Sequence, residues 1–151
     1  MSPATSLYND DFYAWSQHQA ALLRAGKVHE LDLANVAEEL ESLGISQRHA
    51  LENRLAVLVR HLLKWQYQPE RRWRGRRWQS TIVEQRSRIH RLLRDSPSLR
   101  RHVARVLEED YPTIRLRAQI ETGLPPDALP AACPWTEGQS LDECFWPEAM
   151  S

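Results

Sequence analysis

Apolar residues recur at intervals of three and four along most of this chain, and no stretch alternates apolar and polar residues with a period of two. The first spacing places apolar side chains on one face of an α-helix, whereas a half-buried strand requires the second. The clearest run consists of Leu51, Leu55, Leu58, Leu62 and Trp65. The pattern therefore predicts an all-α fold.

Residues 31–68 are expected to form two helices that separate at Gly44. The apolar stripe of the first helix consists of Leu33, Val36, Ala37, Leu40 and Leu43. Gly44 then favours a left-handed helix end, and Ser46 can cap the next helix. That helix should end before Pro69, since the residue preceding a proline is disfavoured in a helix. Glu39 flanks the stripe, so we expect it to be partly buried, with an arginine as its partner.

The rest of the helical pattern ends near residue 123. Thr81 and Glu84 have the spacing of a capping box, which would start the next helix. Pro112 should kink or break the following helix near Tyr111, and Gly123 should end the pattern. We therefore expect a bundle of five to six helices over about residues 9–123.

Five of the nine prolines fall within the stretch that follows the bundle. This composition predicts an extended proline-rich tail, about residues 124–151, that contains one helical turn. Its aromatic and leucine side chains are expected to pack on the bundle. A length of 151 residues is typical of one domain. We expect residues 1–151 to form a single helical domain.

Several stretches are distributed in order along nearly the whole chain: YNDDFYAWSQHQAALLRAG, ANVAEELESLG, LVRHLLKWQYQPE, the arginine-rich segment ending WQSTIVEQR, LLRDSPSLR, ETGLPPDALPAACPW and FWPE. Together they resemble a bacterial family catalogued only as domain of unknown function 29. The resemblance implies a small all-helical fold. It brings no established activity, and hence no catalytic or binding residue.

The apolar runs, the N-terminal segment and the cysteines of the chain indicate where the protein is located and which cofactors it can hold. No apolar run approaches the roughly 20 residues that span a bilayer, and the first 15 residues lack a secretory pattern. Cys133 and Cys144 are the only cysteines, and their spacing fits no zinc motif. We expect a cytoplasmic protein with reduced thiols, no transmembrane segment and no cofactor.

The net charge of zero conceals a strong segregation. Residues 70–105 carry 12 arginines and three acids, whereas residues 108–148 carry nine acids and two arginines. A uniformly basic protein would attract phosphates, but a segregated one can pair its own basic and acidic segments. The charge distribution therefore favours internal pairing over a nucleic-acid interface.

The strongest candidate site is a turn in which arginines alternate with tryptophans. It consists of Arg71, Arg72, Trp73, Arg74, Arg76, Arg77 and Trp78. Arginines can contact phosphates while tryptophans stack on unpaired bases, so the turn is a candidate nucleic-acid site. Alternatively, Trp78 packs on the bundle and the arginines cover it or pair with nearby acids. No recognised nucleic-acid-binding motif accompanies the turn, so we favour the second interpretation.

A weaker candidate is a metal site. His49 and Glu52 lie three residues apart, which lets both side chains reach one cation, and Glu39 offers another oxygen. Helical bundles build metal sites from repeated Glu-x-x-His pairs, but this chain has only one such pair, in reversed order. Solvated or ion-paired side chains are the expected state of these residues.

No catalytic residue stands out, so we do not expect an enzyme. The cysteines lie in an acidic tail that would raise their pKa, and there is no glycine-rich phosphate loop. The sequence favours a non-enzymatic interaction or accessory protein that binds a protein partner or itself. A nucleic-acid-binding module using residues 71–78 is the alternative, and a metal-dependent enzyme ranks third.

Overall fold

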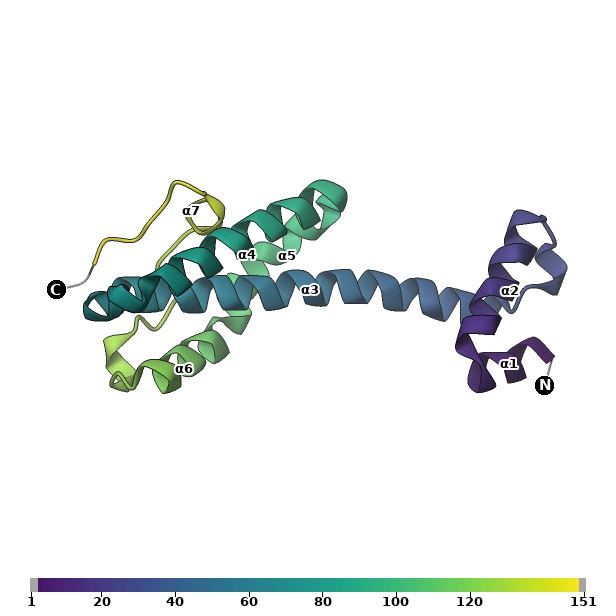
Figure 1. Cartoon of the computed structure of the whole chain (residues 1–151), viewed down its shortest axis with the longest axis horizontal. Coiled ribbons are helices and arrows are strands. Elements are labelled where there is room, and N and C mark those ends of the chain that lie inside the picture. Colours follow the sequence, from purple (N-terminus) through teal and green to yellow (C-terminus); the bar gives the residue numbers. More distant parts are fainter. Residues whose placement is uncertain (1–2, 150–151) are drawn as a thin grey trace. The chain divides into compact units, whose positions relative to one another are not determined.

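The computed structural model describes residues 3–149, although the side chains of residues 3–5 and 72–75 lie outside the described part. The described residues form helices and turns and contain no strand, which confirms the predicted all-α fold (Figure 1). The chain divides into two compact units, residues 1–46 and 47–151. The expectation that both belong to a single domain remains a prediction.

The N-terminal unit contains three helical elements and the beginning of a fourth. These are α1 (Pro3–Asp10), α2 (Phe12–Arg24), a 3-10 turn η1 (Val28–Glu30) and the first residues of α3 (Leu33–Tyr67). Asp11 caps α2 by accepting a hydrogen bond from the Ala14 amide (3.0 Å). Gly26, which follows α2, has a φ of +70°, the left-handed conformation that glycine adopts without steric cost.

An aromatic cluster and one aspartate hold this unit together. The Trp15 ring lies 4.8 Å from that of Tyr8 and 5.5 Å from that of Phe12. Its indole nitrogen donates to the Asp32 carboxylate (3.1 Å), while the Asp32 amide donates to Gln19 (2.8 Å). Only Trp15 and Leu22 are buried among the unit's described hydrophobic residues. The unit thus has a very small core.

Helix α3 runs without interruption from Leu33 to Tyr67. The predicted break at Gly44 and cap at Ser46 are therefore wrong. Gly44 keeps a negative φ, and a single glycine costs a helix only about 1 kcal/mol relative to alanine. The good helix formers on both sides outweigh that cost. The predicted end before Pro69 is confirmed.

The C-terminal unit contains the rest of α3 and the helices that pack on it. They are η2 (Pro69–Arg74), α4 (Gly75–Asp95), η3 (Pro97–Arg100), α5 (Arg101–Arg105), the π-helical turn η4 (Val106–Asp110) and α6 (Tyr111–Thr122). Helix α4 begins six residues before Thr81, so the predicted capping box is wrong. The predicted break near Tyr111 is not present: the backbone stays helical there, and the π-helical turn η4 leads directly into α6. The left-handed helix end at Gly123 (φ +70°) is confirmed.

One hydrophobic core joins these helices to the C-terminal tail. Helix α3 contributes six buried residues, among them Leu51, Leu55 and Leu62, and α4 contributes three, including Ile82 and Ile89. The three α3 residues belong to the clearest helical stripe of the sequence. Among the helices of the described chain, none combines the length and apolar character needed to cross a bilayer.

The tail packs on this core, as predicted. It contains η5 (Pro126–Ala128) and one short helix, α7 (Glu137–Leu141), and it buries Leu129, Trp135 and Leu141. Phe145 and Trp146 are half-buried against the same core. The tail is therefore an integral part of the C-terminal unit.

Side chains of the bundle also hold the tail by its backbone. Arg86 donates to the Ser140 carbonyl (2.9 Å), His90 to that of Leu141, Tyr111 to that of Pro130 and Arg115 to that of Leu129. Arg86 is 1% exposed, and its guanidinium lies 5.5 Å from the centre of the Trp146 ring. Burial lowers the pKa of Arg86, against the opposing charges of Asp142 and Glu143.

Candidate functional site

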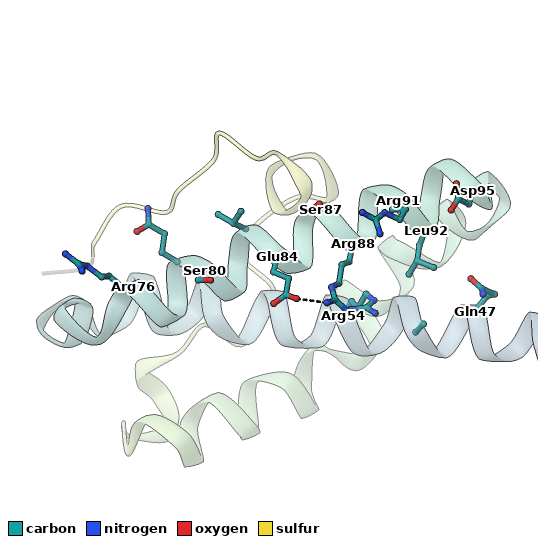
Figure 2. Close-up of a pocket in the computed structure, with 13 residues that line it drawn as sticks. Gln47, Arg54, Arg76, Ser80, Glu84, Ser87, Arg88, Arg91, Leu92 and Asp95 are labelled. Atoms are coloured by element: carbon teal, nitrogen blue, oxygen red, sulfur yellow. Dashed lines mark ion pairs between the residues drawn. The ribbon is translucent and has the colours of Figure 1, made fainter.

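The largest hollow described in the C-terminal unit is an open groove of about 1040 Å³ between α3 and α4. Figure 2 shows Glu84, Arg88 and Leu92 extending from α4 toward α3, where Arg54 lies. The groove-facing residues of α4 recur every three or four positions from Arg76 to Asp95. This periodicity places them along one side of the helix, opposite its buried isoleucines.

The groove is lined by more basic than acidic residues and by a few apolar ones. Its charged residues are Arg54, Arg76, Arg88, Arg91, Glu84 and Asp95, four cations against two anions. Glu84 is already paired with Arg88 (2.7 Å). Arg76 and Arg91 are exposed and have no ion pair within the described chain. The groove therefore presents positive charge that is not neutralised locally.

Ala50, Val83 and Leu92 supply the apolar part of the groove. Val83 is 55% exposed, although it lies beside Ile82, which is fully buried. Val83 is therefore an exposed apolar residue in a groove that arginines also line.

The arginine-tryptophan turn is divided between two surfaces. Arg76 faces the groove, whereas Arg71, Arg77 and Trp78 line a separate hollow of about 260 Å³. The side chains of Arg72, Trp73 and Arg74 lie outside the described residues. The turn side chains that can be placed thus line two different hollows, and a binding role for the turn stays a prediction.

Internal charge pairing occurs, but elsewhere than at the turn. Arg105 pairs with Glu52 (3.0 Å), and Arg100 lies 3.7 Å from Glu137 of the tail. Arg71, Arg76 and Arg77 are exposed and form no ion pair with any described residue. Among the described side chains of residues 70–105, ion pairs with acids outside this segment are formed by Arg100 and Arg105, whereas Arg88 pairs with Glu84 inside it.

Glu121 neutralises the inner side of the smaller hollow. Its carboxylate pairs with Lys64 and with Arg60 (3.3 Å). Burial would raise the pKa of Glu121, but the hydrogen bond from Lys64 and the positive charges of Lys64 and Arg60 lower it overall. The hollow is consequently less basic than its arginines alone suggest.

A third surface lies on the N-terminal unit, which carries eight of the eleven large hydrophobic side chains described as exposed. The apolar stripe at the start of α3 is among them: Leu33 is 60% exposed, and Leu40 and Leu43 are each 64% exposed. The spacing is helical, as predicted, but these three leucines stay largely exposed in the described part of the unit. Residues 28–46 contain five acids and no lysine or arginine.

Glu39 is half-buried, as expected, but its partner is not an arginine. It accepts a hydrogen bond from the Tyr8 hydroxyl, and this bond, with burial and the negative charge of Glu39, raises the pKa of Tyr8 to about 12. Glu39 is thus engaged in holding α1 to α3 within the N-terminal unit.

The other two candidate metal ligands are Glu52, which is engaged in ion pairs, and His49. Glu52 contacts Arg48 (3.4 Å) and Arg105, and His49 is exposed. Within the described residues, no group of three or more His, Cys, Asp or Glu side chains is arranged to hold a metal ion. Burial raises the pKa of the Cys133 thiol, which makes it a poorer nucleophile.

The groove and the exposed stripe were not identified as sites from the sequence. The groove does have a sequence signal: α4 is strongly amphipathic, yet its polar side includes Val83 and unpaired arginines. The stripe looked like an ordinary buried helix face, because periodicity shows which residues share a face but not whether that face is covered.

Comparison with known proteins places the chain in a family. No curated protein and no solved structure matches it. Residues 7–146, however, match the model of a family described as domain of unknown function DUF29. This match covers both units and confirms the resemblance seen in the sequence, so the chain belongs to the DUF29 family, whose function is unknown.

Proposed function

We propose that this protein is a helical interaction or accessory protein that acts by binding rather than by catalysis, and that the N-terminal unit is its binding element. The observation that carries the proposal is the exposed stripe of Leu33, Leu40 and Leu43. Isolated exposed leucines are common, but aligned leucines on one helix face make a contiguous apolar patch.

The small core of this unit supports the proposal. Chains of about 40 residues rarely bury enough surface to be stable without a disulfide, a metal or a partner. The N-terminal unit buries only Trp15 and Leu22 among its described hydrophobic residues. Covering Leu40 and Leu43 would add about 1.5–3 kcal/mol for each fully buried leucine. A partner would therefore stabilise this unit as well as bind it.

The negative charge of residues 28–46 limits which class of partner can bind the N-terminal unit. Residues 28–46 carry five acids without a lysine or arginine, so phosphate groups of nucleic acids or anionic lipids would be repelled. A protein surface that is basic around an apolar strip is complementary to this segment. The stripe therefore fits a protein partner.

Site-specific photo-crosslinking tests the proposal. A photoreactive amino acid at Leu40 should crosslink to a partner in cells, whereas one at Ile120, which is 72% exposed on α6, serves as the matched control. The crosslinked species would be purified and its binding measured with the wild-type chain and with a Leu40→Ala, Leu43→Ala variant. The proposal is supported if the purified partner binds the wild-type chain but not this variant. It is refuted if Leu40 and Ile120 crosslink equally.

Nucleic-acid binding through the basic turn is the second candidate function, favoured by the exposure and lack of ion pairs of Arg71, Arg76 and Arg77. Fluorescence anisotropy with labelled DNA and RNA tests it at low and high salt. This function is supported if the logarithm of the binding constant falls with the logarithm of the salt concentration with a slope of about 0.7–0.9 per phosphate contacted. An Arg76→Ala, Arg77→Ala variant should also bind more weakly than the wild type. Absence of binding at low salt refutes it.

A further inference from the structure

We propose that the partner of the N-terminal unit is a second copy of this chain, and that residues 33–46 of one copy bind in the α3/α4 groove of the other. This inference rests on the proposed function, because it identifies the partner of the same exposed stripe. Three properties of the two surfaces support it: their charges, their apolar residues and their lengths.

The charges of the two surfaces are opposite. The groove carries four arginines against two acids, and Arg76 and Arg91 have no ion pair within the described chain. On the helical wheel of α3, Glu41 flanks the leucine stripe, whereas Glu38 points away from it. Docking the stripe would bring Glu41 and the groove arginines to the same rim, where opposite charges favour the correct pairing.

The apolar residues of the stripe and of the groove are also complementary. Leu33, Leu40 and Leu43 lie along one line of α3, one to two helical turns apart, and each is at least 60% exposed. The groove offers the exposed Val83 together with Ala50 and Leu92 along its length. Leucines at such spacing pack into the groove between two helices by the same ridge-and-groove fit that builds helical bundles.

The lengths of the α3 segment and of the groove are compatible. Residues 33–46 of α3 extend over about 21 Å at 1.5 Å per residue, and the groove follows α4 over about 28 Å from Arg76 to Asp95. Residues 33–46 are therefore short enough to lie along the groove, and the rest of α3 would continue beyond its end.

Each chain carries both surfaces, so two copies can satisfy each other reciprocally. A two-fold arrangement uses both stripes and both grooves and closes into a dimer, the commonest symmetry of soluble oligomers. The expected product is a species of twice the 17.6 kDa chain mass rather than a growing series of oligomers.

The experiment measures the molar mass of the purified full chain by light scattering and its dissociation constant by sedimentation, across the micromolar range. We expect a dimer that weakens as salt rises well above physiological ionic strength, where exposed charges are screened. The Leu40→Ala, Leu43→Ala variant should dissociate about a hundredfold more readily. Leu23→Ala is the matched control, because Leu23 is 53% exposed in the same unit but lies on α2.

Charge reversal tests the pairing itself. Glu41→Arg and Arg91→Glu should each weaken the dimer by about tenfold, and combining them in one chain should restore part of the affinity. Glu38→Arg makes the same charge change on the other side of α3 and should have a much smaller effect. Far-UV circular dichroism establishes that each variant keeps the wild-type helix content.

The outcomes separate this inference from the proposed function. A protein that stays monomeric, or a dimer unaffected by the Leu40, Leu43, Glu41 and Arg91 variants, overturns the second copy as partner. If the photoreactive group at Leu40 then crosslinks to another protein, the proposed function stands and only the identity of the partner changes. If it crosslinks to nothing beyond the Ile120 control, the proposed function fails as well.

Discussion

Truncating Leu129 to alanine tests whether the tail stabilises the fold. Leu129 lies in the tail and is 2% exposed within the core that α3, α4 and α6 form. Its substitution removes three buried carbon atoms and leaves a cavity, while the hydrogen bonds from Arg115 to the Leu129 carbonyl remain. The effect therefore reports on side-chain packing alone.

The expected loss in free energy of unfolding is about 2–5 kcal/mol, the range for buried leucine truncations. For a chain of this size, each kcal/mol lowers the melting temperature by roughly 2–4 °C. Leu116→Ala is the matched control, because Leu116 is 54% exposed on α6 and should lose about 1 kcal/mol or less. Urea unfolding followed by far-UV circular dichroism measures both values.

A difference between the two variants of less than about 0.5 kcal/mol would refute the argument. It would mean that the tail contributes little to the stability of the C-terminal unit. The surface now covered by the tail would then have to be counted as available for binding.

Three further predictions concern titratable groups. Glu39→Gln should lower the pKa of Tyr8 from about 12, because it removes the charge of the Tyr8 partner; NMR titration of labelled tyrosine measures this. The folded-state pKa of Glu121 lies below its ordinary value of 4.5, so its stabilisation is present above that pH and is lost as the pH falls through the folded value. Urea midpoints should therefore fall less on acidification in Glu121→Gln than in wild type. Cys144, which is exposed, should react with a thiol reagent before Cys133, whose pKa is raised by burial, and Cys144→Ser should remove the fast phase.

Sequence periodicity predicted the buried positions of the C-terminal unit because those helices cover one another. Leu51, Leu55 and Leu62 are fully buried, as their spacing indicated. The same spacing at Leu33, Leu40 and Leu43 gave the correct helix but implied a buried face that the structure leaves exposed. Periodicity is a property of one helix, whereas burial requires a second element, and the N-terminal unit does not provide one.

The helix boundary at Gly123, where the backbone is left-handed, was predicted correctly, whereas the one at Gly44, where the backbone stays helical, was not. Gly123 adopts the left-handed conformation that its position indicated. Gly44 does not, because the residues on either side of it continue the helix and a glycine is only mildly unfavourable within one. The groove escaped prediction for a related reason: it requires two helices to be placed side by side, which no local pattern specifies.

The way the bundle holds the tail has a consequence for how the sequence can change. Arg86, His90, Tyr111 and Arg115 all bind carbonyl groups, which every amino acid possesses. The exposed tail residues can therefore be replaced without loss of these bonds, as long as the spacing between the contacted carbonyls is kept. Insertions and deletions between residues 129 and 141 would shift that spacing and should be tolerated far less than substitutions. The four donors fix the path of the tail and leave its exposed side chains free to diversify.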